Sequence, residues 1–172
     1  PTNRMASLSP NVEDPGYRNI SFDQLKDAYV EQISALIDGG IDLVLIETIF
    51  DSLNARAAIM AANDVFRLKN KILPIMISVT ISDKSGRILS GQNLLAFAAS
   101  MKNENIISIG LNCSFGARDL NQFIKELSET QNLFISVYPN AGLPNELGFY
   151  DESPEITSKC IEEMLKEGYL NI

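Results

Sequence analysis

The chain has 172 residues, enough for one domain of ordinary size, and its 45% apolar and 21% charged residues are typical of a globular protein and argue against disorder. Lys and Arg number 14 against 22 Asp and Glu, and the resulting net charge of −8 would repel a nucleic acid. His is absent, so proton transfer and metal binding would depend on other side chains.

A proline-containing irregular loop is expected over residues 1–20, followed by a helix that starts at Ser21. The Ser21 hydroxyl can cap a free backbone N–H, and Gln24, three residues later, completes a capping box. Two glycines at 39–40 end this helix, because glycine accepts the left-handed backbone that helix ends often adopt. The first twenty residues are therefore predicted to precede a regular succession of helix and strand units over 21–172.

Strands and helices are predicted to alternate along the rest of the chain, which indicates right-handed crossovers and a parallel sheet. The run 41–46 lacks polar alternation, so its strand is expected to be buried on both faces. Two architectures fit: an open doubly wound sheet, or about half of a (β/α)₈ barrel, which needs roughly 250 residues. The predicted strands cover 41–46, 74–79, 106–111 and 133–138, with a fifth beginning at 169–172; the predicted helices cover 52–68, 93–101, 117–129 and 154–167.

Polar side chains collect where the predicted strands end, the edge at which parallel sheets bind ligands. Glu47, Thr80 and Cys113 leave successive strands, and Asn140 follows the fourth strand, so they are expected to converge. No Gly-x-Gly-x-x-Gly or P-loop pattern follows a strand, which weakens a nucleotide-binding interpretation. The sequence therefore predicts a small-molecule site at this edge.

Each of these residues has a structural alternative. Glu47 could cap the following helix or anchor a cationic group such as an amine. Cys113 could be a small buried side chain, a nucleophile or a metal ligand; without His, a Cys-His pair cannot form within this chain, and one Cys cannot hold zinc alone. Asn140 could form a turn or offer an amide to a ligand or metal. Cys160 is expected on the core face of the last helix and not in a metal site.

The cellular setting is predicted to be the cytoplasm. The apolar segments are too short to span a membrane, no signal peptide is visible, and two Cys do not suggest a disulfide framework. The chain begins at Pro1 and ends in a predicted strand at Ile172, which indicates a piece of a longer protein.

Six segments stand out: 1–7, 14–20, 47–51 (Glu-Thr-Ile-Phe-Asp), 89–92 (Leu-Ser-Gly-Gln), 110–116 (Gly-Leu-Asn-Cys-Ser-Phe-Gly) and 139–145 (Pro-Asn-Ala-Gly-Leu-Pro-Asn). Together they resemble one family, the homocysteine S-methyltransferase (homocysteine-binding) domains of cobalamin-dependent methionine synthases. The resemblance spans essentially all 172 residues. It implies a partial (β/α)₈ TIM barrel of about the C-terminal half, with parallel strands four to seven and the start of strand eight.

The resemblance also implies a metal site and a reaction. Zinc in this family is held by three Cys; Cys113 matches the first, and the other two are expected beyond Ile172. Asn140 matches an amide that fills the fourth zinc position until the substrate thiol replaces it, and Glu47 matches the acid that binds the amino group of homocysteine. The homocysteine thiolate then takes a methyl group from methylcobalamin, which another domain binds and methyltetrahydrofolate remethylates, to give methionine.

The chain alone is expected to bind zinc weakly and to be inactive, because it carries one of three thiolates. Half a barrel would leave two unpaired sheet edges and an open apolar interior, so copies would pair into a homodimer or missing segments would complete the barrel. Two other interpretations stay open: a non-catalytic half-barrel, and a different small-molecule enzyme on a TIM barrel with Glu47 as acid or base.

Overall fold

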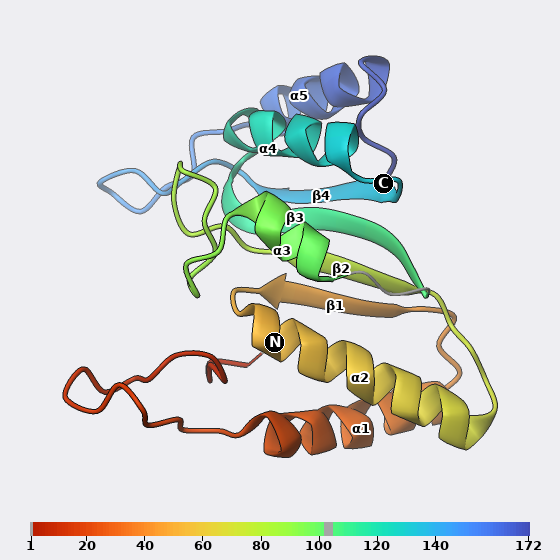
Figure 1. Ribbon diagram of the computed structural model, residues 1–172. Helices are drawn as coiled ribbons and strands as arrows, with labels where there is room; N and C mark the ends of the chain where they lie inside the picture. Colours follow the sequence, from red (N-terminus) through yellow and green to blue (C-terminus); the bar gives the residue numbers. More distant parts are fainter. Residues whose placement is uncertain (1, 102–104) are drawn as a thin grey trace.

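The computed structural model describes residues 2–101 and 105–172 (Figure 1). Residues 2–20 form an irregular segment, as expected. The helices are α1 (Phe22–Asp38), α2 (Ser52–Lys69), α3 (Leu94–Ser100), α4 (Ala117–Thr130) and α5 (Pro154–Lys166). The strands are β1 (Val44–Ile49), β2 (Ile75–Val79), β3 (Ile106–Gly116) and β4 (Phe134–Asn140).

The four strands form one parallel sheet in the order β1-β2-β3-β4, so neighbours in sequence are neighbours in space. In Figure 1, α1 and α2 lie beside β1, and α4 and α5 lie beside β4 at the opposite end of the sheet. Sequential order is what a barrel requires, whereas a doubly wound sheet reverses its strand order at a switch point. The open α/β sheet predicted as part of a barrel is confirmed.

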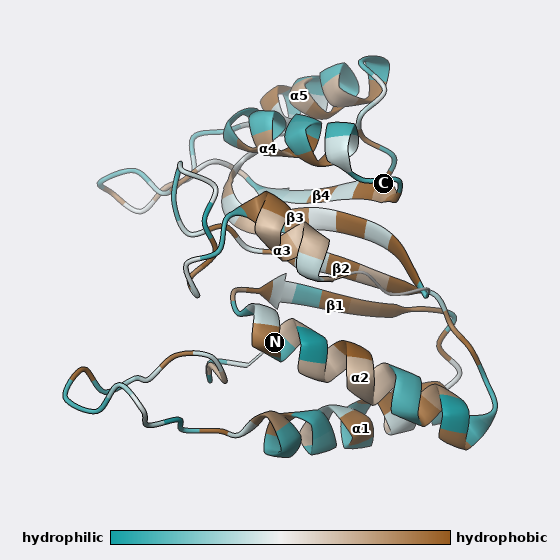
Figure 2. Cartoon of the chain, viewed as in Figure 1, coloured by the Kyte–Doolittle hydropathy of each residue, from teal (hydrophilic) through white to brown (hydrophobic). Residues whose placement is uncertain are grey.

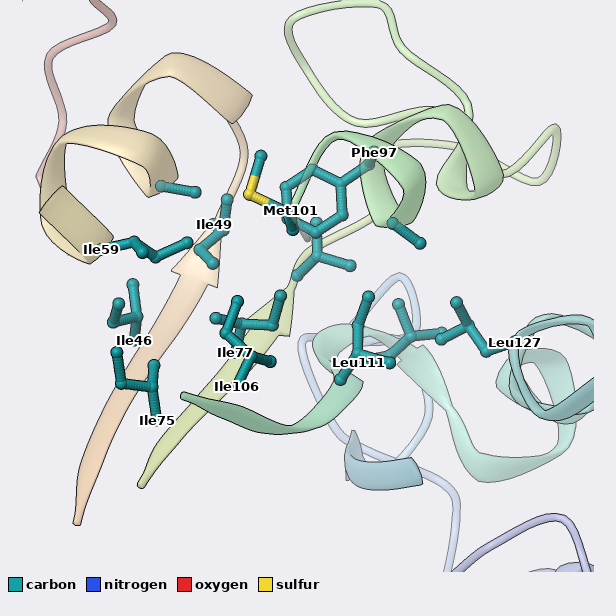
Figure 3. Packing of buried hydrophobic residues seen from close by; sticks show 14 of the residues in the cluster. Ile46, Ile49, Ile59, Ile75, Ile77, Phe97, Met101, Ile106, Leu111 and Leu127 are labelled. Atoms are coloured by element: carbon teal, nitrogen blue, oxygen red, sulfur yellow. The ribbon is translucent and has the colours of Figure 1, made fainter. Parts of the chain in front are cut away.

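The main core lies between one face of the sheet and the helices. Ile46, Ile77, Ile109 and Ile135 are neighbours through the strand register, and all four are buried. Figure 3 shows such strand residues close to Ile59 of α2, Phe97 and Met101 around α3, and Leu127 of α4. Figure 2 accordingly shows β1 to β3 largely in brown, while the helices alternate brown and teal.

The opposite face of the sheet differs from the open apolar interior expected from the sequence. Its central row consists of Ser78, Gly110 and Ser136, which are paired in register and buried. Ser108 Oγ lies 3.3 Å from Ser136 Oγ, which places another serine on this face. The expectation that the first strand is buried on both faces is also wrong, because Leu45 on this face is 37% exposed.

Several strand bounds depart from the predicted ranges. β1 begins three residues later than expected, and β3 continues five residues further, to Gly116. The expected fifth strand does not form: residues 169–172 lie in no strand. Asn171 N and Ile172 N nevertheless donate to Ile135 O at 2.9 and 3.1 Å, so this segment lines the free edge of β4.

Local capping agrees with the sequence. Ser21 and Gln24 form the predicted capping box of α1, and Gly40 has a left-handed φ of 87° after that helix ends. Asp51 caps α2, and its other carboxylate oxygen accepts from Ser7 N at 3.0 Å and Ser7 Oγ at 2.8 Å. Asp51 therefore ties the N-terminal segment to the carboxyl end of β1. Across the described ranges, no helix has the length and apolar character needed to cross a membrane.

An ion pair between α1 and α2 gives the fold a dependence on pH. Lys26 Nζ lies 3.1 Å from Asp64 Oδ2, and Arg67 also pairs with Asp64. The hydrogen bond from Lys26 holds the pKa of Asp64 below its ordinary value of 3.8. Because the folded-state pKa is the lower one, this contribution to stability is complete above about pH 4 and is lost as the pH falls through the lowered value.

We expect Asp64→Asn to lower the free energy of unfolding of the intact protein at pH 7, and the deficit to shrink below pH 4. Urea unfolding at pH 7, 5 and 3 measures this. Glu162→Gln, which removes an exposed pair with Lys166 inside α5, is the control and should have a smaller effect at pH 7. A deficit at Asp64 that is the same at all three pH values would contradict the assignment.

Candidate functional site

Two irregularities of the sheet mark the carboxyl ends of its strands. The register of β1 with β2 shifts between Ile46 and Ile49, and that of β3 with β4 shifts between Asn112 and Gly116. Such bulges turn side chains away from the regular alternation of a strand. Glu47 lies in the first shifted stretch and Cys113 in the second, so both predicted site residues leave the sheet at a bulge.

The backbone at these bulges has an uncommon conformation. Thr48, Cys113 and Ser114 have φ values of 55°, 57° and 65°, in the left-handed region that non-glycine residues rarely adopt. For a β-branched residue such as Thr48 this conformation is especially unfavourable. Strain of this kind persists only where surrounding contacts hold it, and it is concentrated at functional sites.

Cys113 is an exposed, free cysteine, so its interpretation as a small buried side chain is wrong. Cys160 on α5 is half-buried, while Met164 of the same helix is fully buried. Cys160 packs against the core, as expected, whereas Ile156 one turn earlier is 38% exposed, so the core face of α5 is confined to its C-terminal part. The two cysteines lie on different elements and form no disulfide.

The side chain of Asn112 connects the ends of three strands. Its Oδ1 accepts from Thr48 N at 3.0 Å and from Ser78 Oγ at 2.7 Å. Its Nδ2 donates to Thr48 Oγ1 at 3.0 Å and to Cys113 Sγ at 3.1 Å. Thr80 Oγ1 donates to the Asn112 carbonyl at 3.3 Å. The buried amide of Asn112 thus contacts both Thr48, next to Glu47 on β1, and the thiol of Cys113 on β3.

Glu47 is exposed, and the helix that follows is capped by Asp51, so the helix-cap interpretation of Glu47 is wrong. A cavity of about 180 Å³ lies beside β1, between that strand and helices α1 and α2. Glu47 and Thr48 contribute to its lining, whereas Cys113 and Asn140 do not. The structure therefore links Glu47 to Cys113 through Thr48 and Asn112 and not through this cavity.

Asn140 is the last residue of β4, half-buried, and it pairs with Gly116 just after the Cys113 bulge. Gly116 also lies against the carboxylate of Glu152: a Cβ at Gly116 would lie 2.1 Å from Glu152 Oε1. A larger residue at Gly116 would require the Glu152 side chain to move, so the 141–152 segment packs directly beside the end of β3.

A metal site is only partly represented. Within residues 2–101 and 105–172, no group of three or more His, Cys, Asp or Glu side chains could hold a metal ion. Cys113 fits as one ligand, because its sulfur is exposed at the ligand-binding edge of the sheet, and the Asn140 amide belongs to the neighbouring strand end. The described donor set does not make a complete zinc site.

Sequence reasoning attributed no role to Asn112 or Thr48. The signal that could have found Asn112 is its place directly before Cys113, at the end of an otherwise apolar strand. Nothing in the sequence points to Thr48, because its part depends on a left-handed backbone and a contact 64 residues away.

Comparison with known proteins gives two results. The family model described as Homocysteine S-methyltransferase matches residues 1–172. The fold is similar to the crystal structure of the homocysteine methyltransferase MmuM from Escherichia coli in its metallated form, with a TM-score of 0.60 and 22% sequence identity. That match covers 77% of this chain and 44% of that protein, so this chain corresponds to less than half of its length.

Proposed function

Since the chain belongs to the homocysteine S-methyltransferase family, we propose that residues 1–172 are part of a barrel domain that transfers a methyl group to the sulfur of homocysteine. The observation that carries the proposal is the exposed Cys113 at a bulged strand end, within a family match that covers the whole chain. Methyl transfer to homocysteine by the intact protein, measured as methionine formed, tests it.

Cys113 is proposed as one of three thiolate ligands of a zinc ion, with the other two supplied by protein beyond this chain. Zinc, when bound, supplies the Lewis acidity that keeps a coordinated thiol deprotonated at neutral pH. Asn140 is proposed to offer its amide at the fourth position in the absence of substrate. Its pairing with Gly116, three residues after Cys113, supports that role.

Glu47 is proposed to bind the amino group of homocysteine. The carboxylate is exposed at the ligand-binding edge, makes no cap to α2, and belongs to β1, whose end is fixed through Thr48. A carboxylate in this position can accept hydrogen bonds from an ammonium group and thereby orient the substrate sulfur.

We expect Glu47→Gln in the intact protein to raise the KM for homocysteine by about 10- to 100-fold, the usual loss when a hydrogen bond to a charged group is removed. Melting temperature should change little, because the side chain is exposed. Steady-state kinetics with varied homocysteine measures this, and Asp42→Asn, an exposed acid just before β1, is the matched control. An unchanged KM would reject the amine-binding role.

The methyl donor is proposed to be methylcobalamin, held by another domain of a cobalamin-dependent methionine synthase, with methyltetrahydrofolate as the ultimate source. The support is the set of motifs at 1–7, 14–20 and 139–145, which resemble that enzyme. Assays of the intact protein with methylcobalamin, a methylsulfonium donor and betaine separate the alternatives. Methionine formed only with methylcobalamin is the expected result.

The isolated 172-residue chain is proposed to be inactive, in a protein that works in the cytoplasm. Within the described ranges no group of three or more His, Cys, Asp or Glu side chains could hold a metal ion, which supports this. The same finding also favours the alternative of a non-catalytic half-barrel whose copies pair through open edges. Zinc analysis of this chain and of the intact protein distinguishes the two. Zinc in the intact protein alone supports the enzyme, whereas its absence from both supports the non-catalytic alternative.

A further inference from the structure

We propose that Asn112 is a positioning residue: its carboxamide fixes the sulfur of Cys113 and the Glu47–Thr48 end of β1 relative to one another. The inference rests on the proposed function, because it assigns how two parts of that site are held. Asn112 is 3% exposed and sits on the face of the sheet that carries the central row of serines. The oxygen and nitrogen of its side chain therefore form hydrogen bonds with protein groups and not with solvent.

The orientation of the amide follows from its partners. Thr48 N is a backbone donor, so the atom 3.0 Å from it must be the amide oxygen. The Ser78 hydroxyl lies on the same oxygen. The nitrogen consequently faces Thr48 Oγ1 and Cys113 Sγ, and its two hydrogens can be donated one to each. The N–H···S contact is thus fixed by the rest of the network.

The same network holds the strained backbone on both sides. Thr48 is restrained twice, through its N–H and its hydroxyl, at a φ of 55°. Cys113 is restrained through its sulfur at a φ of 57°. Without the amide, each segment would lower its free energy by relaxing to a backbone conformation with negative φ, because strained backbone costs roughly 1–3 kcal/mol per residue.

A fixed position of the sulfur matters because the Cys113 side chain is exposed and would otherwise be mobile. A free cysteine on the surface samples several rotamers, and a metal or substrate that needs one of them must offset the lost entropy. The Asn112 N–H selects one position of Sγ and leaves further lone pairs of the sulfur available. Residues that orient metal ligands in this way usually change metal affinity by about 10- to 100-fold when they are replaced.

The test replaces Asn112 in the intact protein by Asp, which keeps the acceptor and loses the donors, and by Leu, which has a similar shape with neither. Both variants should bind zinc about 10- to 100-fold more weakly in competition with a chromogenic chelator. Ser78→Ala is the matched control, since it removes a hydrogen bond from the other end of the same amide. It should lower the melting temperature but weaken zinc binding less than either Asn112 variant, because the Thr48 N–H still orients the amide.

A spectroscopic measurement on the wild type avoids any dependence on variants that do not fold. In asparagine-labelled intact protein, the side-chain amide resonance of Asn112, assigned through its proximity to the backbone N–H of Thr48, should shift when zinc is added. The shift should be absent in Cys113→Ser. An unmoved resonance in zinc-loaded wild type overturns the inference, as do folded Asn112 variants with wild-type zinc affinity. If intact wild type binds no zinc at all, the proposed function itself is rejected, and this inference falls with it.

Discussion

Replacing Cys113 by Ser in the intact protein is expected to abolish both zinc binding and methyl transfer. The substitution removes a thiolate ligand itself, so the loss should exceed the 10- to 100-fold typical of residues that only support ligands. Because Cys113 is exposed, the free energy of unfolding of the zinc-free protein should change by no more than about 0.5 kcal/mol. Metal analysis, methionine formation and urea unfolding of the same preparations measure the three quantities.

Cys160→Ser is the matched control for this experiment. It removes the other thiol of the chain, which is half-buried on α5, and should keep zinc and activity. Full activity in Cys113→Ser would reject the metal role and with it the proposed function. Loss of zinc in both variants would mean that these substitutions disturb the fold, and that the loss in Cys113→Ser is not due to removal of a zinc ligand.

Gly110→Ala is expected to destabilise the fold strongly. A Cβ at Gly110 would lie 2.1 Å from Ser136 O and 2.2 Å from Ser136 Oγ, across the β3–β4 pair. Real Cβ atoms do not approach other atoms so closely, and a backbone oxygen within a sheet cannot move aside without breaking the pairing. We therefore expect a loss of about 3 kcal/mol or more, at the upper end for overpacking in a core. Urea unfolding of the intact protein measures it.

Two further variants separate the steric effect at Gly110 from loss of polar contacts. Ser108→Ala, also buried on β3, loses one 3.3 Å hydroxyl contact and should cost about 1 kcal/mol. Adding Ser136→Gly to Gly110→Ala removes the hydroxyl but leaves the backbone oxygen, so stability should not return. A Gly110→Ala protein within about 1 kcal/mol of wild type would mean that β3 and β4 lie further apart than described.

The helices could be predicted from the sequence because their signals are local. Ser21 with Gln24, Asp51 before α2, and Ser153 with Pro154 each identify a helix start within four residues. The placement of Glu47 and Cys113 at strand ends was also predictable, since an apolar run followed by polar residues marks the ligand-binding edge. Both predictions need only the order of residues along one element.

The details that shape the site depend on contacts between distant segments. β3 continues to Gly116 because its register with β4 resumes after a bulge, which no local pattern in 112–116 reveals. The left-handed backbone at Thr48 is held by a residue 64 positions later. The fifth strand was expected from apolar residues at 169–172, but there only a few backbone hydrogen bonds to β4 form.

The small side chains on the face of the sheet opposite the main core have a consequence for any closed barrel built on this sheet. A barrel interior is filled by layers of side chains contributed by all its strands. At the middle level β2, β3 and β4 contribute little volume, because Ser78, Gly110 and Ser136 are among the smallest residues. The strands that complete the barrel must then carry bulky residues at the same level. Large side chains from that half would fill the space left by the small side chains of this half.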